Sequence, residues 1–431
     1  MQVNIAAAPR ARKLRRAEDE AVVTGTEYAQ RLKQHFESGS GDTSWAAVAS
    51  GDRQGSDDEE GDVLQRALRS TAPAVAKATT LGQTHISMTR CVDANISKAA
   101  KAVVSTVQWH PDAGRSLLMA ASGDKALRFY SIDGENNPLV SSAFCESMPV
   151  TAAGFAQGGA EVIAVGRRPF FYTYDVATGA LSRTSKLIGR EEKSWESLAV
   201  NPSVMGGSAV HALFGRHGSI SLVSARSKQW VGELKMNGEV RAGAFAADGM
   251  TLVTVGTEGA VYHWDMRMHK CIARHDDDGL SPGTAVAVDA ANGTMAVGSK
   301  AGVVNLYDTA SMPREYTPSV AAAAGAFAPL GASSQPSAAP SLRKGVMNLT
   351  TPIDTLAFNH DGQIMVMGSR RLQDQMRLLH VPSGTVYQNW PTAATPLHYV
   401  ESAAFSGDSK YLAIGNDRGR VLLYTLNHYS S

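Results

Sequence analysis

The stretch that decides the fold runs from residue 240 to 265 and reads VRAGAFAADGMTLVTVGTEGAVYHWD. It opens with an alternating segment, Val240 to Phe245, and then turns at Asp248-Gly249. A short apolar run that closes on Gly256 follows, and a third segment ends with Trp264-Asp265. Alternating segments of strand length, separated by Gly and Asp turns, are typical of antiparallel strands. We therefore predict three consecutive strands of one sheet here.

The same pattern recurs on both sides of this stretch. Alternating segments that end on an aromatic residue also begin at Val104, Val150, Ile353 and Val400. The third segments close at Asp133, Asp175, Ala225, Asp265, Asp308, Val381 and Thr425. Their usual spacing of about 40 to 50 residues, and the Trp-Asp ending at 264–265, are typical of four-stranded propeller blades. The repeats predict an all-β fold, a seven-bladed WD40-type β-propeller, with the third unit from Trp195 to Lys228 the least regular.

One gap between closing positions is longer than the others. It contains the stretch 312–345, which holds 9 Ala, 5 Pro, 5 Ser and 3 Gly. Such composition is typical of a low-complexity loop. We place this loop between the fifth and sixth blades.

A propeller also needs a device that closes the ring, because an open ring leaves unpaired sheet edges. Closure commonly joins an outer strand from one terminus to the blade formed by the other terminus. We expect His85 to Asp93 to supply that strand and to complete the C-terminal blade.

The chain before the repeats, 1–83, is predicted to be an extended, partly helical N-terminal arm, and 84–431 the propeller. A helix is expected from about Glu18 to Phe36, with an apolar face that a helix this short cannot bury alone. An acidic run at 57–60 follows it. The predicted partner-binding anchors of the arm are Tyr28, Leu32, Phe36 and Trp45. The basic block of the arm consists of Arg10, Arg12, Lys13, Arg15 and Arg16.

Composition excludes several classes of protein. The 431 residues carry 41 Lys and Arg against 40 Asp and Glu, a net charge of +1, so a uniformly basic nucleic-acid coat is not expected. Three widely spaced cysteines fit a reducing compartment better than secretion. No apolar stretch approaches the roughly 18 residues that span a bilayer, and no signal-peptide core follows Met1. We expect a soluble protein without membrane contact.

Catalytic chemistry has little support in the sequence. No His-Glu-x-x-His, Gly-x-Ser-x-Gly or phosphate-loop motif occurs. Asp recurs at equivalent strand ends, which favours a structural turn over an asymmetric catalytic cluster. His110 and His263 are interpreted as turn and core histidines. We predict no enzyme activity, no catalytic residue, no metal site and no cofactor.

Two arginine pairs are candidate contacts for phosphates or acidic partner segments. Arg167-Arg168 and Arg370-Arg371 occupy comparable places after a second strand, so both pairs are expected on one rim of the ring. Arginine forks suit phosphate and carboxylate groups. A solvated turn or an intra-blade ion pair is the alternative. For the block from Arg10 to Arg16, the alternatives are a nuclear targeting patch, an RNA-contacting arm or an uncommitted basic tail.

Several blocks together resemble one WD-repeat family. They are Arg12-Lys-Leu-Arg15, Gly25-Thr-Glu-Tyr28, Trp45-Ala46, Asp93-Ala-Asn95, Gly123-Asp-Lys125, Gly166-Arg-Arg168, Gly302-Val-Val-Asn305, Asn389-Trp-Pro-Thr392 and Leu426-Asn-His-Tyr429. The family is that of the eighteenth U3 small nucleolar RNA-associated protein, a UTP-B subunit of the small-subunit processome. The similarity extends over nearly the whole chain.

This resemblance implies a non-catalytic nucleolar scaffold of the U3 small nucleolar ribonucleoprotein, acting in pre-18S rRNA processing and 40S ribosome biogenesis. Its implied partners are other UTP-B subunits, namely propeller and helical-repeat proteins, together with U3 RNA and pre-rRNA. The alternative from the repeats alone is a WD-repeat adaptor that recruits substrates to another nuclear complex, such as a ubiquitin ligase.

Overall fold

The computed structural model describes residues 2–4, 14, 22–39, 81–184, 187, 192–202, 209–289, 291–309, 340–392 and 395–429. The chain divides into two compact units, Met1–Gly82 and Gln83–Ser431. Each unit is described by itself.

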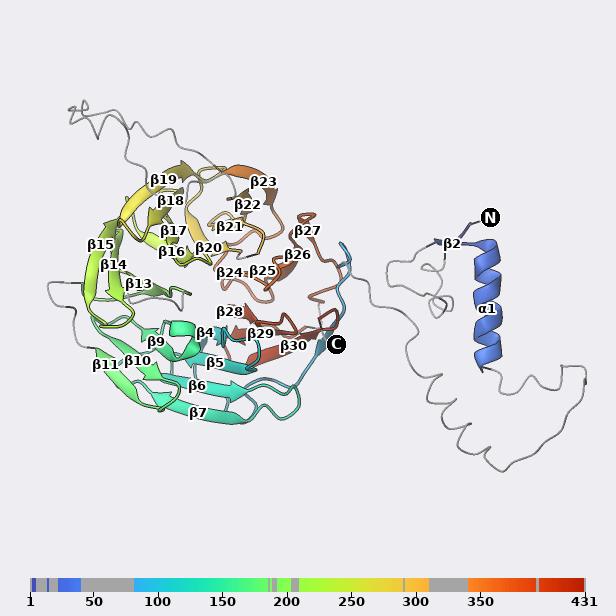
Figure 1. Cartoon of the computed structure of the whole chain (residues 1–431), viewed down its shortest axis with the longest axis horizontal. Helices are drawn as coiled ribbons and strands as arrows, with labels where there is room; N and C mark the ends of the chain where they lie inside the picture. Colours follow the sequence, from blue (N-terminus) through green and yellow to red (C-terminus); the bar gives the residue numbers. More distant parts are fainter. Residues whose placement is uncertain are drawn as a thin grey trace, which may run out of the picture. The chain divides into compact units, whose positions relative to one another are not determined.

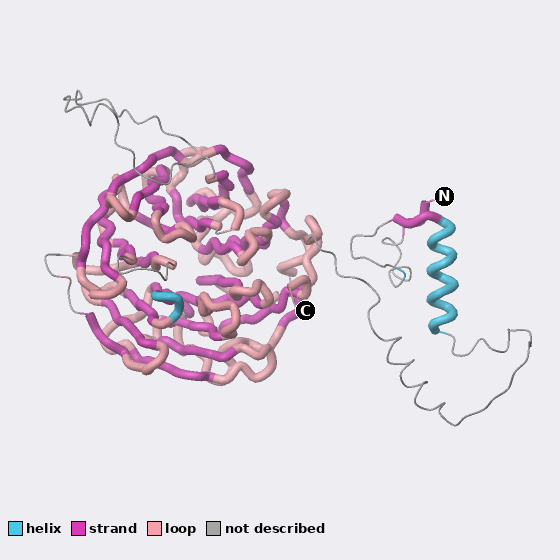
Figure 2. The backbone as a smooth tube through the Cα atoms, in the orientation of Figure 1, coloured by secondary structure: helices cyan, strands magenta, loops and turns pink. Residues whose placement is uncertain are grey.

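The larger unit is a ring of seven antiparallel four-stranded sheets (Figures 1 and 2). The strands of each blade are given from the channel outward. The first blade consists of β4 (Val104–Trp109), β5 (Leu117–Ser122), β6 (Ala126–Ser131) and β7 (Leu139–Phe144). The second consists of β8 (Ala152–Ala156), β9 (Glu161–Val165), β10 (Phe171–Asp175) and β11 (Leu181–Thr184). The third and fourth are β12 (Ser197–Ala199), β13 (Val210–Phe214), β14 (Ser219–Ser224), β15 (Trp230–Lys235), then β16 (Val240–Phe245), β17 (Thr251–Gly256), β18 (Ala260–Asp265), β19 (Lys270–Asp276).

The remaining blades follow the same order. The fifth and sixth are β20 (Gly283–Val288), β21 (Thr294–Ser299), β22 (Val304–Asp308), β23 (Ser341–Val346), then β24 (Thr355–Phe358), β25 (Ile364–Gly368), β26 (Met376–His380), β27 (Thr385–Val386). The seventh is β28 (Val400–Phe405), β29 (Tyr411–Asn416), β30 (Val421–Leu426) and β3 (Met88–Arg90). A short 3-10 turn follows β8 at Gln157–Gly159. The predicted seven-bladed propeller is confirmed.

Ring closure also follows the prediction. The strand β3 pairs antiparallel with β30, with Met88 opposite Leu426 and Arg90 opposite Tyr424. The strand lies within the segment His85 to Asp93, so the expected closure is confirmed. The last blade therefore contains three strands from the C-terminal end of the chain and one from far upstream.

The residues just before β3 are held by the sixth blade. The Ile86 N–H donates to Asn389 Oδ1 at 3.0 Å, and Asn389 Nδ2 donates back to the Ile86 carbonyl at 2.6 Å. The Thr385 hydroxyl donates to the Gln83 carbonyl at 3.0 Å. One side chain of the Asn-Trp-Pro block thus satisfies both backbone groups of a buried residue, which orients the closing strand.

The low-complexity loop was predicted wrongly at its C-terminal end. Residues 341–345 belong to β23, which pairs with β22 as the outer strand of the fifth blade. The insertion therefore lies inside the fifth blade, between its third and fourth strands, and not between the fifth and sixth blades. Five of the six β23 residues are exposed, so the strand lacks the alternation of buried and exposed residues that would predict it from the sequence. Residues 310–339 lie outside the described part.

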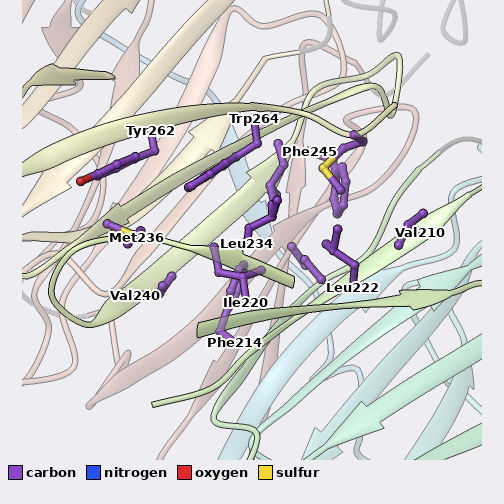
Figure 3. Close-up of a cluster of buried hydrophobic side chains, with 14 of the residues drawn as sticks. Val210, Phe214, Ile220, Leu222, Leu234, Met236, Val240, Phe245, Tyr262 and Trp264 are labelled. Atoms are coloured by element: carbon purple, nitrogen blue, oxygen red, sulfur yellow. The ribbon is translucent and has the colours of Figure 1, made fainter. Parts of the chain in front are cut away.

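The core of the ring lies between neighbouring blades. Figure 3 shows one such cluster, in which Phe214, Ile220 and Leu222 of the third blade face side chains of the fourth. A Cβ atom added at Gly243 would lie 2.4 Å from the Phe214 ring, so this glycine lets the blades approach closely. Trp264 stacks on Tyr262 and donates its indole N–H to the Thr254 hydroxyl at 2.8 Å.

Hydroxyl groups join the innermost strands of successive blades. The hydroxyls of Ser105, Thr151, Thr284 and Thr355 each donate to a carbonyl at the start of the next blade, on Val150, Glu196, Ile353 and Glu401 respectively. Backbone acceptors at the inner edge of a sheet would otherwise lack a partner. These bonds fix the spacing of blades around the channel.

The smaller unit contains β1 (Gln2–Asn4), β2 (Val22–Thr24) and α1 (Gly25–Gly39), with β1 and β2 paired antiparallel. The predicted helix start near Glu18 was wrong. Thr24 precedes the helix, its hydroxyl accepts the Glu27 N–H at 3.4 Å and donates to the Glu27 carboxylate at 3.0 Å. The Thr24 hydroxyl therefore caps the first turn by accepting a backbone N–H, which agrees with a helix start at Gly25.

Candidate interaction surface

Both predicted arginine pairs lie in equivalent connections of the ring. Arg167-Arg168 joins β9 to β10, and Arg370-Arg371 joins β25 to β26, so each pair links the second and third strands of its blade. All four residues are exposed. Because every blade has the same strand order, these connections emerge on the same rim of the propeller.

Arg370 is held in an ion-pair network between two blades. Its Nε lies 3.2 Å from Asp354 Oδ1, and its Nη1 lies 3.8 Å from Glu401 Oε2. Its backbone N–H also donates to Asp354 at 3.2 Å. Burial raises the pKa of Glu401, and the Arg370 charge opposes that rise. Half of the Arg370 side chain is solvent-exposed, so solvent screens these pairs.

Within each pair, one arginine is anchored and the other faces solvent. Arg168 donates its Nε–H to the Ser147 carbonyl at 3.3 Å, and Arg370 makes the contacts given above. The side chains of Arg167 and Arg371 make no hydrogen bond or ion pair with the part of the chain that the structure describes. The intra-blade ion pair is therefore present at Arg370, with Asp354, whereas Arg168 makes a hydrogen bond to the backbone. Binding of phosphates or acidic partner segments by the four arginines stays a prediction.

The predicted anchors of the arm are only partly within the described residues. Tyr28 and Leu32 lie one turn apart on α1, where Tyr28 is half-buried and 45% of Leu32 is exposed. Phe36 lies in the same helix, but its side chain is outside the described residues, as is all of Trp45. The basic block Arg10, Arg12, Lys13, Arg15 and Arg16 also lies outside them.

Sequence reasoning missed a buried polar cluster between the fourth and fifth blades. The imidazoles of His263 and His275 stack with ring centroids 5.3 Å apart, and His275 meets Tyr307 edge-on. The Tyr307 hydroxyl donates to Asp277 Oδ1 at 2.7 Å, and Asn305 Nδ2 donates to the same oxygen at 3.1 Å. Burial lowers the pKa of His263 to about 3 and that of His275 to about 4.

These histidines are neutral core residues at physiological pH, and they make folding sensitive to acid. The unfolded chain takes up their protons near pH 6.5, whereas the folded chain does so only near pH 3 to 4. Above pH 6.5 these histidines are neutral in both states and do not lower the free energy of unfolding. That free energy falls as the pH decreases from 6.5 toward 4, because only the unfolded chain then binds the protons. Linkage predicts a loss of up to about 1.4 kcal/mol per pH unit for each histidine.

Replacement of His263 by Phe should reduce this acid dependence by the contribution of His263, and that of His275 should remain. Urea unfolding between pH 7 and 5 measures the slope, and replacement of the exposed His85 by Phe is the matched control. Equal slopes for the wild-type chain and the His263→Phe variant would contradict the assignment.

Two kinds of feature are absent from the described ranges. No group of three or more His, Cys, Asp or Glu side chains there is arranged to hold a metal ion. In the same ranges, no helix combines the length and apolar character needed to cross a membrane.

A recess of about 580 Å³ opens between the outer parts of the fifth and sixth blades. Lys344, Arg377, Met347, Tyr387 and Trp390 are among its lining residues. The Lys344 stem lies on Gly384, where an added Cβ would come within 2.4 Å, and its ammonium donates to the Ser383 carbonyl at 3.3 Å. The Arg377 guanidinium donates to the Met376 carbonyl at 2.8 Å, so both cations of the recess are held by backbone acceptors.

Comparison with known proteins gives a consistent result. The chain is 35% identical over its whole length to "U3 small nucleolar RNA-associated protein 18 homolog" of Arabidopsis thaliana, of which it covers 75%. It is 32% identical over 97% of its length to "Probable U3 small nucleolar RNA-associated protein 18" of Schizosaccharomyces pombe, covering 77% of that protein. The mouse homolog is 32% identical over 93% of the chain and is covered to 68%. No protein-family model matches the chain.

Proposed function

Because the chain belongs to the U3 small nucleolar RNA-associated protein 18 family, we propose that it is a non-catalytic scaffold subunit of the small-subunit processome. It acts in pre-18S rRNA processing and 40S ribosome biogenesis within the U3 small nucleolar ribonucleoprotein. Its place is the nucleolus of the nucleus, and its partners are other UTP-B subunits, U3 RNA and pre-rRNA.

One structural observation supports this proposal above the others. The ring is braced between blades by hydroxyl groups and by the Arg370 ion pairs, while Arg167 and Arg371 extend outward from the same rim. A rigid disc with exposed arginine forks binds several phosphate or carboxylate groups at fixed separations. The buried His263 and His275 pack against each other and Tyr307 in the core between blades.

The first test identifies the RNA that the protein binds in cells. The tagged full-length chain is purified, and the bound RNA is sequenced. Recovery of U3 and of the 5′ region of pre-rRNA is expected. Recovery of ubiquitin-ligase subunits without ribosome-assembly factors would instead favour the adaptor function and overturn the proposal.

The second test concerns the rim. The double variant Arg167→Glu and Arg371→Glu should reduce recovery of U3 about tenfold, because two favourable contacts become repulsive. Arg226, an exposed residue between β14 and β15, lies in a third-to-fourth-strand connection on the opposite rim. Arg226→Glu is the matched control and should leave recovery unchanged. Unchanged recovery with the double variant would exclude these arginines as contacts.

The third test concerns the arm. Replacing Tyr28, Leu32, Phe36 and Trp45 by Ala should release the protein from the other UTP-B subunits while the propeller stays folded. Each anchor is expected to contribute about 1 to 3 kcal/mol of binding free energy. Co-purification with the subcomplex is the measurement, and Ala at the exposed helix residues Gln30 and Lys33 is the control. Undiminished co-purification of the fourfold variant would show that the anchors are misassigned.

A further inference from the structure

The outer strands of the ring differ in how their free edges are protected. A charged side chain on an edge strand hinders pairing with another chain, and a very short edge strand offers little to pair with. Charged residues occur in five of the seven outer strands: Arg183 in β11, Glu233 and Lys235 in β15, Lys270, Arg274 and Asp276 in β19, Arg343 and Lys344 in β23, and Arg90 in β3. The outer strand of the sixth blade, β27, carries no charge but is only two residues long. The exception is β7.

The strand β7 is long, uncharged and apolar on its exposed side. Its six residues read LVSSAF, and burial alternates strictly along it. Val140 is 62% exposed and Phe144 is 59% exposed, with Ser142 exposed between them. The other side faces the second blade, where the Ser141 hydroxyl lies 2.8 Å from the Tyr174 hydroxyl. An uncharged edge with two exposed large side chains is the pattern that soluble proteins avoid unless a partner covers it.

The backbone of β7 also has hydrogen-bonding groups available. The Cys145 N–H donates to the Lys125 carbonyl at 2.7 Å, so this residue faces β6. Alternation then directs Ala143 and Ser141 toward β6, and Ser142 and Phe144 away from it. The N–H groups of Ser142 and Phe144 therefore point away from β6, the one strand that β7 pairs with in its sheet.

We infer that the free edge of β7 accepts an extended segment of another protein as a fifth strand of the first blade. Main-chain bonds to Ser142 and Phe144 would supply affinity, and alternate apolar side chains of the incoming segment would cover Val140 and Phe144. This site lies on the outer circumference of the ring. It is distinct from the arginine rim and from the arm, so it does not depend on the function proposed above.

Charges at the two ends of β7 specify the chemistry of the incoming segment. Asp133 and Glu135 are exposed in the turn before the strand, and Glu146 is exposed just after it. Backbone N–H groups of Asn137, Glu135 and Asn136 lower the pKa of Asp133, which keeps it ionised. The occupant is therefore apolar in its middle and basic at both ends.

The same charges argue against a second copy of this chain as the occupant. An antiparallel pairing of two β7 strands centred on Ser142 would place Glu146 of each copy beside the acidic turn of the other. Like charges brought together in this way oppose association. A partner protein fits the edge better.

The test uses the full chain and a defined synthetic peptide, Lys-Arg-Val-Thr-Ile-Thr-Val-Lys-Arg. Fluorescence anisotropy measures its binding, and residue-resolved amide hydrogen exchange locates it. We expect exchange at Ser142 and Phe144 to slow at least about tenfold, and exchange at Ser141 and Ala143 to stay unchanged, because only the first two amides point away from β6. Binding without protection of β7, or no binding, would overturn the inference.

Variants make the test specific. Phe144→Lys and, separately, Val140→Lys should each weaken peptide binding at least about tenfold by adding a charge to the edge. Val231→Lys on β15, which replaces a residue 45% exposed on a protected strand, should have no effect. A peptide with Glu at its four terminal positions should bind at least about tenfold more weakly. Equal binding of the two peptides, or a chain dimer abolished by Phe144→Lys, would refute the proposed occupant.

Discussion

Removal of residues 1–93 should destabilise the propeller by roughly 5 kcal/mol, because the last blade then loses its outer strand. The lost contacts include the pairing of β3 with β30, the bond from the Cys91 N–H to the Leu423 carbonyl, and the burial of Ile86 against the sixth blade. The exposed edge of β30 would also become available for aggregation. Urea unfolding monitored by Trp fluorescence measures the loss.

The matched control is removal of residues 1–80, which leaves β3 and its Asn389 contacts in place. This shorter deletion should leave the unfolding free energy of the ring unchanged, since Gln83–Ser431 forms its own compact unit. A synthetic peptide of residues 83–95 should partly restore the longer deletion by mass action. Equal stability of the two truncated chains would show that β3 does not close the ring.

Replacement of Gly256 by Ala should cost about 3 kcal/mol, the upper part of the range for overpacked cores. Gly256 ends the second strand of the fourth blade, the position at which the repeats place a recurring glycine. An added Cβ would lie 2.3 Å from the Glu239 carbonyl oxygen and 2.7 Å from the Met236 methyl group. The Met236 side chain can move, but the carbonyl belongs to the backbone that pairs the first two strands.

Gly368 provides the control, because it ends the second strand of the sixth blade. There an added Cβ would lie 3.5 Å from Val400 Cγ1, an ordinary contact distance. Gly368→Ala should therefore be neutral, or stabilising by up to about 1 kcal/mol through the unfolded state. Equal costs at the two positions in urea unfolding would show that the Gly256 contact does not decide the outcome.

Much of the architecture follows from local patterns in the amino-acid sequence. The number of blades and the end of each third strand depend on hydrophobic alternation and turn residues, which are encoded within a few residues of each position. The closing segment was expected because an open propeller leaves unpaired sheet edges. The resemblance to one family likewise rests on short blocks. Where local alternation is absent, prediction fails. The exposed β23 has the composition of a loop, and the helix start is misplaced before Gly25 because the strand partner of Val22–Thr24 lies far upstream.

Among the site residues, sequence could find the arginine pairs but not their roles. Arg370 is bound to Asp354 and Glu401, whereas Arg371, its neighbour in the chain, extends outward. That difference depends on the placement of Arg370 beside Asp354 of its own blade and near Glu401 of the next blade. The Asn389 contacts with Ile86 and the edge-on contact of His275 with Tyr307 have the same origin, since the first joins segments distant in the sequence and the second joins two neighbouring blades.

Local periodicity was thus enough to specify seven like sheets, and the need to close such a ring predicted the strand that joins the two ends. Folding in three dimensions decided which side chains meet across blade boundaries, which arginines remain exposed, and which edge strand keeps a free apolar side. The physical reason is range: alternation and turn propensity act over a few residues, whereas ion pairs, packed rings and unpaired edges depend on groups that only closure of the ring brings together.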